Sequence, residues 1–401
     1  MQNQIMQSNP AAPRGLINMI APRAIYFFYF AALANLAPYL ALYYQSLGLT
    51  GGQIGILIGI SPIAGLIAAP SWGALADTTR QHKRILLLTI AASSISVFIL
   101  SFIRPYAWLV LIVAVYAFFT TPIIPLVDNS VLELLGDRRQ EYGKQRVWGS
   151  YGWGLAGLVS GLLIQRFGLP VIFYAFAILL SFGLIAAARF PVSQRSISGK
   201  LDLKALRLFT ERNWLVFLGV VMVIGAAMAM VGNYFMIYLR VLSTPDAWLG
   251  VALALAIVSE IPFLFFSDRL LRRFGIVGLI VMGGGVVGLR ALMFSFASAP
   301  WQALMLQLLH GLTYALVLVG GVEYASRIAP PGLGATAQGV FGGVFNGLGY
   351  AFGSLVGGLL LDSVGVMGMY RWAGVGVLLA VIIFYFASVK VDIGAPEENI
   401  L

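Results

Sequence analysis

Long apolar stretches alternate with short polar linkers along almost the whole chain. Each stretch has about 20 residues, the length an α-helix needs to cross a hydrocarbon core about 30 Å thick. Strands of a membrane barrel would be shorter and would alternate apolar with polar residues. The pattern therefore predicts an all-α membrane protein with twelve transmembrane helices. The expected spans are 24–47, 54–76, 85–103, 106–134, 144–165, 169–189, 214–240, 247–268, 276–297, 301–326, 334–361 and 369–388.

Composition and charge agree with this prediction. Of the 401 residues, 60% are hydrophobic and 10% are charged, whereas a soluble domain has about 25% charged residues. The net charge of +10 does not indicate nucleic-acid binding, because Lys and Arg are spread over the linkers that follow the even-numbered spans. By the positive-inside rule, these linkers and both termini lie in the cytoplasm, and we expect a multi-pass protein of the cell (inner) membrane. The basic residues of these linkers are Arg80, Lys83, Arg84, Arg138, Arg139, Lys144, Arg195, Lys200, Lys204, Arg207, Arg212, Arg269, Arg272, Arg273 and Arg327.

One polar and basic linker divides the chain into two halves of six spans each. The expected organisation is an N-terminal six-helix bundle over 1–190, a cytoplasmic central loop over 191–213 and a C-terminal six-helix bundle over 214–401. An acidic residue followed by basic residues comes after the second span of each half, Asp77 in the first and Asp268 in the second. Such internal symmetry is typical of transporters built from parallel repeats.

Three ionisable side chains, Glu260, Arg290 and His310, lie near the middle of apolar spans. Charged groups are costly in hydrocarbon, so they usually face a cavity and mark a route for substrate or protons. Arg290 and His310 lie at equal distances in the sequence on either side of Pro300, in the short turn 298–300. An antiparallel hairpin would place both about 15 Å from that turn, near the membrane midplane. These positions are the first indication of a transporter.

A second polar cluster is expected on the fourth and fifth spans. Asp128 and Arg146 lie on adjacent antiparallel helices, where an acid and a base can neutralise each other and lower the cost of both in hydrocarbon. Trp153 lies close to two helical turns after Arg146 and therefore on the same face. An indole beside a guanidinium can hold a flat or ring-shaped solute by stacking and by hydrogen bonds at its edge. The three residues are therefore candidate substrate-binding residues.

Each of these residues also has a structural interpretation. Asp128 and Arg146 can form a clamp near a helix end, and Trp153 can pack against lipid or core. His310 can be a hydrogen-bonded core residue, and Glu260 can serve only to neutralise a neighbouring cation. Both interpretations stay open for each residue taken alone.

Glycines recur at every fourth residue in three places. Small residues at this spacing let helix backbones approach closely in lipid, so we expect tight packing on these faces. The three sets are Gly51, Gly55 and Gly59, then Gly339, Gly343 and Gly347, and finally Gly349, Gly353 and Gly357.

Two six-span halves joined by a long central loop resemble the major facilitator superfamily. The segment after the second span resembles a degraded form of that family's loop motif between helices 2 and 3, with Arg80 in place of a glycine. The resemblance implies a fold of two pseudo-symmetric six-helix bundles and a conformational role for this loop. The residues that carry this motif, with its counterpart in the second half, are Gly73, Asp77, Arg80, Lys83 and Asp268.

The start of the fifth span has a narrower resemblance. The run from Tyr142 to Trp153, YGKQRVWGSYGW, resembles the fifth-helix segment of the lactose permease group and of phenylpropionate-permease-like proteins. The resemblance implies that Arg146 and Asp128 are sugar ligands. It also implies that Trp153 stacks on the sugar ring.

The resemblance extends to the ninth and tenth spans and then departs from the group. Arg290 and His310 match the arginine and histidine of its proton-coupling and sugar-recognition network. Thr313 stands where the group has a proton-carrying glutamate, so a coupling proton must be carried by another residue. Glu260 is the candidate, because apolar surroundings favour its neutral form and a nearby Arg290 favours its charged form. A carboxyl group whose neutral and charged forms are both favoured in this way can bind and release a proton as the cavity opens and closes.

These observations predict a secondary transporter, in particular a proton-coupled symporter of a small organic solute, with a sugar or a nucleoside favoured. The alternatives are aromatic-acid uptake or solute efflux on the same fold, and a non-transporting membrane receptor or scaffold. An enzyme is not expected, because the chain has no HExxH motif, no GxxxxGK[ST] motif and no obvious catalytic cluster. We expect no cofactor and no metal. The expected partners are the solute, protons and the lipid bilayer, with a monomeric chain that does not bind nucleic acid.

Overall fold

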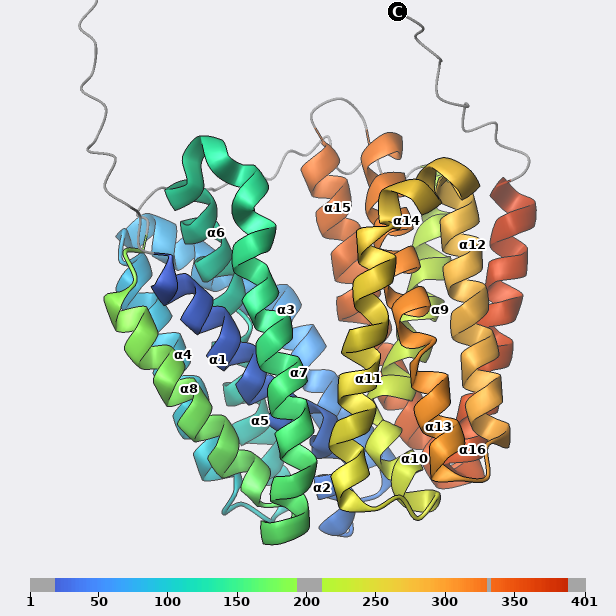
Figure 1. The fold of residues 1–401 in the computed structure, drawn as a ribbon, viewed down its shortest axis with the longest axis horizontal. Coiled ribbons are helices and arrows are strands. Elements are labelled where there is room, and N and C mark those ends of the chain that lie inside the picture. The colour runs from blue at the N-terminus through green and yellow to red at the C-terminus, as the bar shows by residue number, and fades with distance from the viewer. Residues whose placement is uncertain (1–18, 193–210, 330–332, 389–401) are drawn as a thin grey trace, which may run out of the picture.

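The structure is a computed structural model, and it describes residues 19–192, 211–329 and 333–388. In these ranges the chain is helical and contains no β-strand. The first half of the chain forms one helical bundle and the second half forms another beside it (Figure 1). The predicted all-α architecture of two bundles is therefore confirmed. Most of the expected central loop, residues 193–210, lies outside the described residues.

The N-terminal bundle consists of α1 to α8, and two of its spans are interrupted. The first span contains the short 3-10 helix η1, which includes Pro38, and the fourth span breaks at Pro122. Proline has no backbone N–H to continue a helix, so both interruptions have a local cause. The elements are α1 Ile20–Leu36, η1 Ala37–Tyr39, α2 Leu40–Ser46, α3 Gly51–Thr79, α4 His82–Leu100, α5 Tyr106–Thr120, α6 Ile123–Leu135, η2 Gly136–Glu141, α7 Tyr142–Phe167 and α8 Val171–Arg189.

The C-terminal bundle consists of α9 to α16, and three of its spans are interrupted. Tyr234 separates α9 from α10, Leu308 and Leu309 separate α13 from α14, and the π-helical turn η4 lies between α15 and α16. Single π-helical turns are frequent at functional sites. The elements are α9 Arg212–Asn233, α10 Phe235–Val241, α11 Asp246–Phe265, α12 Ser267–Phe296, α13 Pro300–Gln307, α14 His310–Ile328, α15 Gly334–Gly342, η4 Gly343–Gly349 and α16 Tyr350–Ser388.

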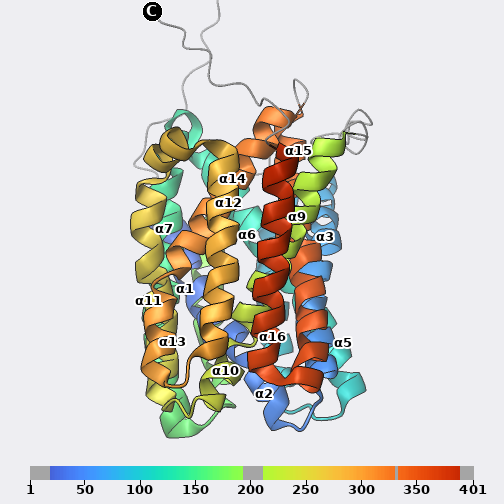
Figure 2. The same cartoon turned by 90° about the vertical axis from the view of Figure 1, so that its right-hand side faces the viewer.

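Ten helical stretches in the described ranges are long and apolar enough to cross a membrane. Two of them, Tyr106–Phe167 and Gly334–Ala387, have 62 and 54 residues, well over the length of about 20 residues that one crossing needs. Each stretch turns back on itself (Figures 1 and 2), and each contains a glycine with positive φ, Gly136 in the first and Gly365 in the second. The number of twelve spans requires both stretches to cross twice, and it stays a prediction.

The two bundles contact each other at the end of the molecule where α3 begins and α16 bends, which we call the closed end. The carboxylate of Asp362 on α16 accepts hydrogen bonds from the backbone N–H groups of Gly51 (2.6 Å) and Gly52 (2.8 Å). These are the first residues of α3, and such N–H groups have no acceptor within their own helix. A residue of one bundle therefore caps a helix of the other.

Glycines bring helix backbones together at the closed end. A Cβ atom at Gly55 of α3 would meet the backbone of Ser354 on α16, and one at Gly161 of α7 would meet the start of α11. Gly353 lies in the same way against the backbone of α9. Close backbone approach is therefore confirmed for two of the three predicted glycine sets. In the remaining set, Gly339, Gly343 and Gly347, a Cβ atom at Gly339 would have open space around it, so the prediction of tight packing is wrong at that position.

The opposite end of the molecule contains the α3–α4 turn, the 136–141 segment, the start of α12 and the end of α16 (Figure 1). The described basic linkers lie at this end, which we call the basic end. The positive-inside rule predicts that it faces the cytoplasm.

Candidate functional site

A cavity of about 280 Å³ lies between the two bundles, with Trp153 on the N-terminal side. Much of its lining comes from places where spans are interrupted: η1, the α9–α10 break, both sides of the α13–α14 break, and the residue directly after η4. Transporters commonly build their binding sites from discontinuous helices. The lining residues at these interruptions are Ala37, Pro38, Asn233, Phe235, Gln307, His310 and Tyr350.

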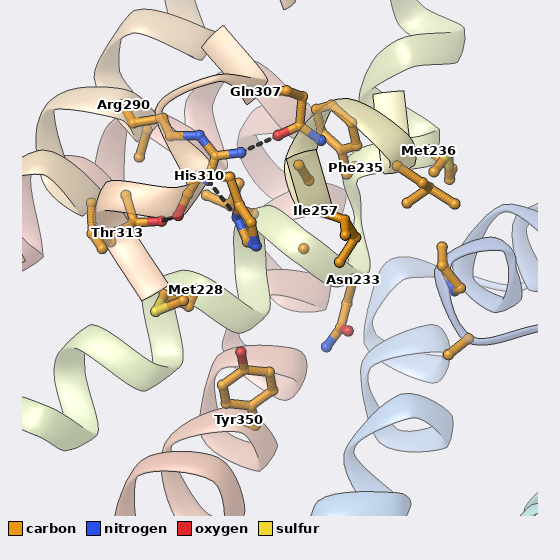
Figure 3. Close-up of a pocket in the computed structure, with 18 of the residues that line it drawn as sticks. Met228, Asn233, Phe235, Met236, Ile257, Arg290, Gln307, His310, Thr313 and Tyr350 are labelled. Carbon is orange, nitrogen blue, oxygen red and sulfur yellow. Dashed lines mark hydrogen bonds between the residues drawn. The ribbon is translucent and has the colours of Figure 1, made fainter. Parts of the chain in front are cut away.

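Arg290 of α12 lines this cavity and is only 7% exposed. Its Nε donates a hydrogen bond to the carbonyl oxygen of Leu306 (3.1 Å), and its Nη2 donates one to the amide oxygen of Gln307. Its Nη1 lies 3.4 Å from Nδ1 of His310 (Figure 3). The guanidinium carbon also lies 4.9 Å from the centre of the Phe294 ring. The α12–α13 hairpin therefore brings Arg290 and His310 together as predicted, while their roles stay predictions.

The break between α13 and α14 results from a side chain of a neighbouring helix. In a regular helix the N–H of Gly311 would donate to the carbonyl oxygen of Gln307. It donates instead to Oγ of Ser259 on α11 (3.0 Å), and this hydroxyl lies 3.4 Å from the Gln307 carbonyl. A Cβ atom at Gly311 would collide with the Ser259 backbone. Insertion of a side chain into the hydrogen-bond ladder is an established cause of a sharp helix kink.

Gln307 connects three helices at this break. Its amide oxygen accepts from Arg290 of α12, and its Nε2 donates to the carbonyl oxygen of Ala252 on α11 (3.2 Å). Gln307 is almost completely buried. It therefore helps to hold the guanidinium of Arg290 in place.

Other polar groups surround the open space of the cavity. The hydroxyl of Tyr350 points toward His310 across a space that Met228 and Asn233 flank (Figure 3). Thr313 donates its hydroxyl hydrogen to the carbonyl oxygen of His310 (2.6 Å), as is common for this residue type inside helices. Among these groups, His310 and Tyr350 direct polar atoms at the space itself.

The three predicted substrate-binding residues are separated in this structure. Trp153 lines the cavity, whereas Asp128 and Arg146 are not among its lining residues. Asp128 accepts a hydrogen bond from the hydroxyl of Tyr26 (2.5 Å), and the guanidinium of Arg146 lies over the rings of Phe30 (4.2 Å) and Tyr26 (5.3 Å). Within the described ranges no ion pair of 4.0 Å or less joins Asp128 to Arg146, but the two groups are close enough to interact electrostatically, so mutual neutralisation stays a prediction. The hydroxyl satisfies the acid, and the aromatic faces hold the guanidinium.

Glu260 on α11 is half-buried and is not among the cavity-lining residues. The described part of the chain contains no hydrogen bond or ion pair between Glu260 and either Arg290 or His310, so the predicted contact with Arg290 is not formed. Tyr314 on α14 is close enough to interact electrostatically with both Glu260 and Arg146. Glu260 and Arg146 therefore both lie near Tyr314, and the proton-coupling role of Glu260 stays a prediction.

The loop motif lies in the α3–α4 turn at the basic end. Arg80 ends α3 with φ 55° and ψ 28°, the left-handed region that glycine adopts most easily. This backbone conformation would suit the glycine that the resemblance implies at this position. Oδ1 of Asp77 lies 3.0 Å from Nε2 of His82, the buried first residue of α4. Lys83 and Asp268 are exposed, and the part of the motif in transport stays a prediction.

Three polar residues of the cavity, Asn233, Gln307 and Tyr350, were not among the residues considered from the sequence. Asn233 and Gln307 had a usable signal, because each is an uncharged polar residue inside an apolar span. Gln307 also lies one helical turn before His310 and so on the same face. Tyr350 had no comparable signal, because tyrosines are frequent throughout these spans.

Comparisons with known proteins agree on the class. A family model described as the MFS_1 like family matches residues 19–372. The maltose permease of Geobacillus stearothermophilus is 29% identical over 384 residues, which cover 93% of this chain and 95% of the permease. The xanthosine permease of Escherichia coli (strain K12) is 25% identical over 389 residues, which cover 90% of this chain and 92% of that protein. The crystal structure of the nucleoside transporter NupG matches with a TM-score of 0.84 at 18% identity, over 93% of this chain and 99% of that one.

Proposed function

Because the chain belongs to the MFS_1 like family and the proteins it is similar to are membrane transporters and not enzymes, we propose that it is a proton-coupled symporter of a sugar or a nucleoside. The observation that carries the proposal is the cavity between the two bundles. It contains a buried cation, Arg290, in contact with a titratable group, His310. Intramembrane groups of this kind usually mark a solute or proton route.

Alternating access is the proposed mechanism. The bundles meet closely at the closed end, and the cavity lies between them. Rocking one bundle against the other around such a site would expose it to each side of the membrane in turn. We place the protein in the cell membrane as a monomer with both termini in the cytoplasm, so that the closed end faces outside.

The proposed solute site is the cavity, which Trp153 lines, together with Asp128 and Arg146. Trp153 supplies a ring on which the solute can stack. Arg146 and Asp128 belong to the same bundle and would come within reach of the solute as the bundles move. Similarity to a maltose permease and to a xanthosine permease favours a ring-shaped solute. Glu260 is the proposed proton carrier, and Arg290 and His310 are the other residues proposed to take part in proton coupling.

Transport by purified protein in liposomes tests the proposal. Vesicles loaded with unlabelled xanthosine or maltose are diluted into the radiolabelled solute, and counterflow is measured. We expect transient accumulation of one of the two labels, and net uptake that increases when the outside is made acidic. Trp153→Ala should reduce both signals, whereas Trp301→Ala, at an exposed site on α13, serves as the matched control.

A receptor or scaffold on the same fold would give a different result. Binding of a solute without counterflow would favour that alternative and would refute the transport proposal. Counterflow that does not respond to an imposed pH gradient would refute the proton coupling alone.

A further inference from the structure

The positive charge of Arg290 has no acidic counterpart in the cavity. Its guanidinium contacts the carbonyl oxygen of Leu306, the amide oxygen of Gln307, an imidazole nitrogen of His310 and the ring face of Phe294. None of these groups carries a negative charge, and no Asp or Glu is among the described residues that line the cavity. Burying a cation without an anion is costly. A negatively charged solute would supply the missing compensation.

The cavity presents hydrogen-bond donors to such a solute. A guanidinium has five N–H groups, and the three protein contacts of Arg290 leave two of them for a ligand. Because an arginine can only donate, Nδ1 of His310 must accept, and the ring proton is therefore on Nε2. This nitrogen points away from Arg290 into the open space (Figure 3). Arg290 and His310 thus form a donor edge that suits a carboxylate or an ionised ring.

The remaining walls are mostly apolar. Met228, Met236, Phe235 and Ile257 come from the C-terminal bundle, and Trp153 comes from the N-terminal bundle. Thioether and aromatic side chains pack well against the flat face of a ring. A sugar carries hydroxyl groups around its rim, and each would need a polar partner when it is buried. The walls therefore suit a flat ring better than a sugar.

We propose that the transported solute is a planar ring compound with one negative charge, held by Arg290 and His310 at its charged edge and by the thioether and aromatic side chains at its faces. This inference rests on the transport function proposed above and narrows its solute class. An acidic oxopurine nucleoside and an aryl carboxylate both belong to the class. A neutral disaccharide does not.

Two matched pairs of solutes test the charge requirement without any mutation. Xanthosine, whose oxopurine ring ionises near neutral pH, is compared with inosine, which stays neutral. The second pair is 3-phenylpropionate and its neutral amide, and maltose is measured beside them. Affinities are determined by titration calorimetry on the purified protein in detergent. We expect the anion of at least one pair to bind at least tenfold more tightly than its neutral partner.

The pH dependence separates charge on the solute from charge on the protein. Xanthosine binding should strengthen as the pH rises through the ionisation of its ring. Over the same range, phenylpropionate is already ionised and its affinity should not follow that curve. If the two solutes change in parallel with pH, a protein group sets the dependence and the donor-edge assignment is wrong.

Three variants test whether the charge requirement lies at Arg290. Arg290→Gln should weaken binding of the anion more than binding of its neutral partner and so bring the ratio of the two affinities close to one, whereas Arg290→Lys should retain part of the preference. Gln307→Leu leaves the charge in place but removes the amide that positions it, so it should reduce the preference without abolishing it. Gln307→Leu also tests the charge requirement if Arg290→Gln does not fold.

The outcomes distinguish this inference from the transport proposal. Equal affinity for both members of each pair, or binding of maltose but of no anion, would overturn the inference and leave transport intact. Counterflow of no solute would overturn the transport proposal, and the narrower solute class with it.

Discussion

Removing the carboxylate of Asp362 should shift the balance between the two orientations of the bundles. This side chain caps the first two N–H groups of α3 from the other bundle, at 2.6 and 2.8 Å. When the closed end opens, the cap must be lost and both N–H groups must be hydrated by water. Asp362→Ala removes the contact from the closed arrangement only, so it should favour opening.

The size of the effect follows from the geometry. Loss of a capping residue costs about 0.5–2 kcal/mol, and hydrogen bonds to a charged acceptor contribute about 1.5–3 kcal/mol each when they are shielded. Asp362 is exposed, so water replaces part of the loss. We therefore expect about 1–2 kcal/mol, which lowers the ratio of closed to open molecules about 5–30-fold.

Distances between the bundles measure this ratio directly. The chain contains no cysteine, so two introduced cysteines are the only thiols available for spin labels. Gln45 on α2 and Ser298 in the α12–α13 turn are exposed and belong to different bundles at the closed end. Pulsed electron paramagnetic resonance on Asp362→Ala should show growth of a longer-distance population.

Ser363→Ala is the matched control for this experiment. Its hydroxyl donates only within its own helix, to the carbonyl oxygens of Leu359 and Leu360, so the distance distribution should match that of the unmodified chain. If Asp362→Ala gives the same distribution as the control, the cap does not stabilise the closed arrangement and the reasoning fails.

Four further predictions concern the site and the loop. Glu260→Gln should abolish uphill accumulation in proteoliposomes but preserve counterflow; if accumulation in response to a pH gradient persists, the proton is carried by another group. Arg146→Lys should raise the Kd for the solute about 2–30-fold, because a compact ammonium cannot reproduce the planar two-pronged contact of a guanidinium, a loss of about 0.5–2 kcal/mol; unchanged calorimetric affinity would contradict a ligand role. Arg80→Gly should raise stability by about 0.5–1 kcal/mol, as a higher Tm, because glycine adopts the left-handed conformation more easily. Ser259→Ala should weaken solute binding by letting α13 and α14 straighten, and a Kd equal to that of Ser259→Thr would argue against this.

Features that depend on local sequence were predictable. The turn before Pro300 was expected from its apolar flanks, and equal arms then place Arg290 beside His310, where the structure has them. Glycine spacing likewise predicted which face of α3 meets another backbone. Both predictions need only helix periodicity and one short turn.

Features that depend on distant partners were not predictable in the same way. The sequence places Asp128 and Arg146 on adjacent helices, but it does not show that Tyr26, 102 residues away, satisfies the acid. The cap formed by Asp362 joins residues 311 positions apart. A carboxylate in an apolar chain must find a partner, and many hydroxyl and N–H groups can serve. The choice among them is made by tertiary packing.

The helix break beside His310 shows why the site itself was the hardest part to predict. Leu308 and Leu309 are good helix formers, and hydropathy over a whole span cannot register a change in a single hydrogen bond. The break requires both Ser259 as an alternative acceptor and the missing side chain of Gly311, which lets α11 approach. Neither residue is unusual alone. Because the same break directs Gln307 toward Arg290, the geometry of the cavity depends on a contact between two helices that only the folded chain brings together.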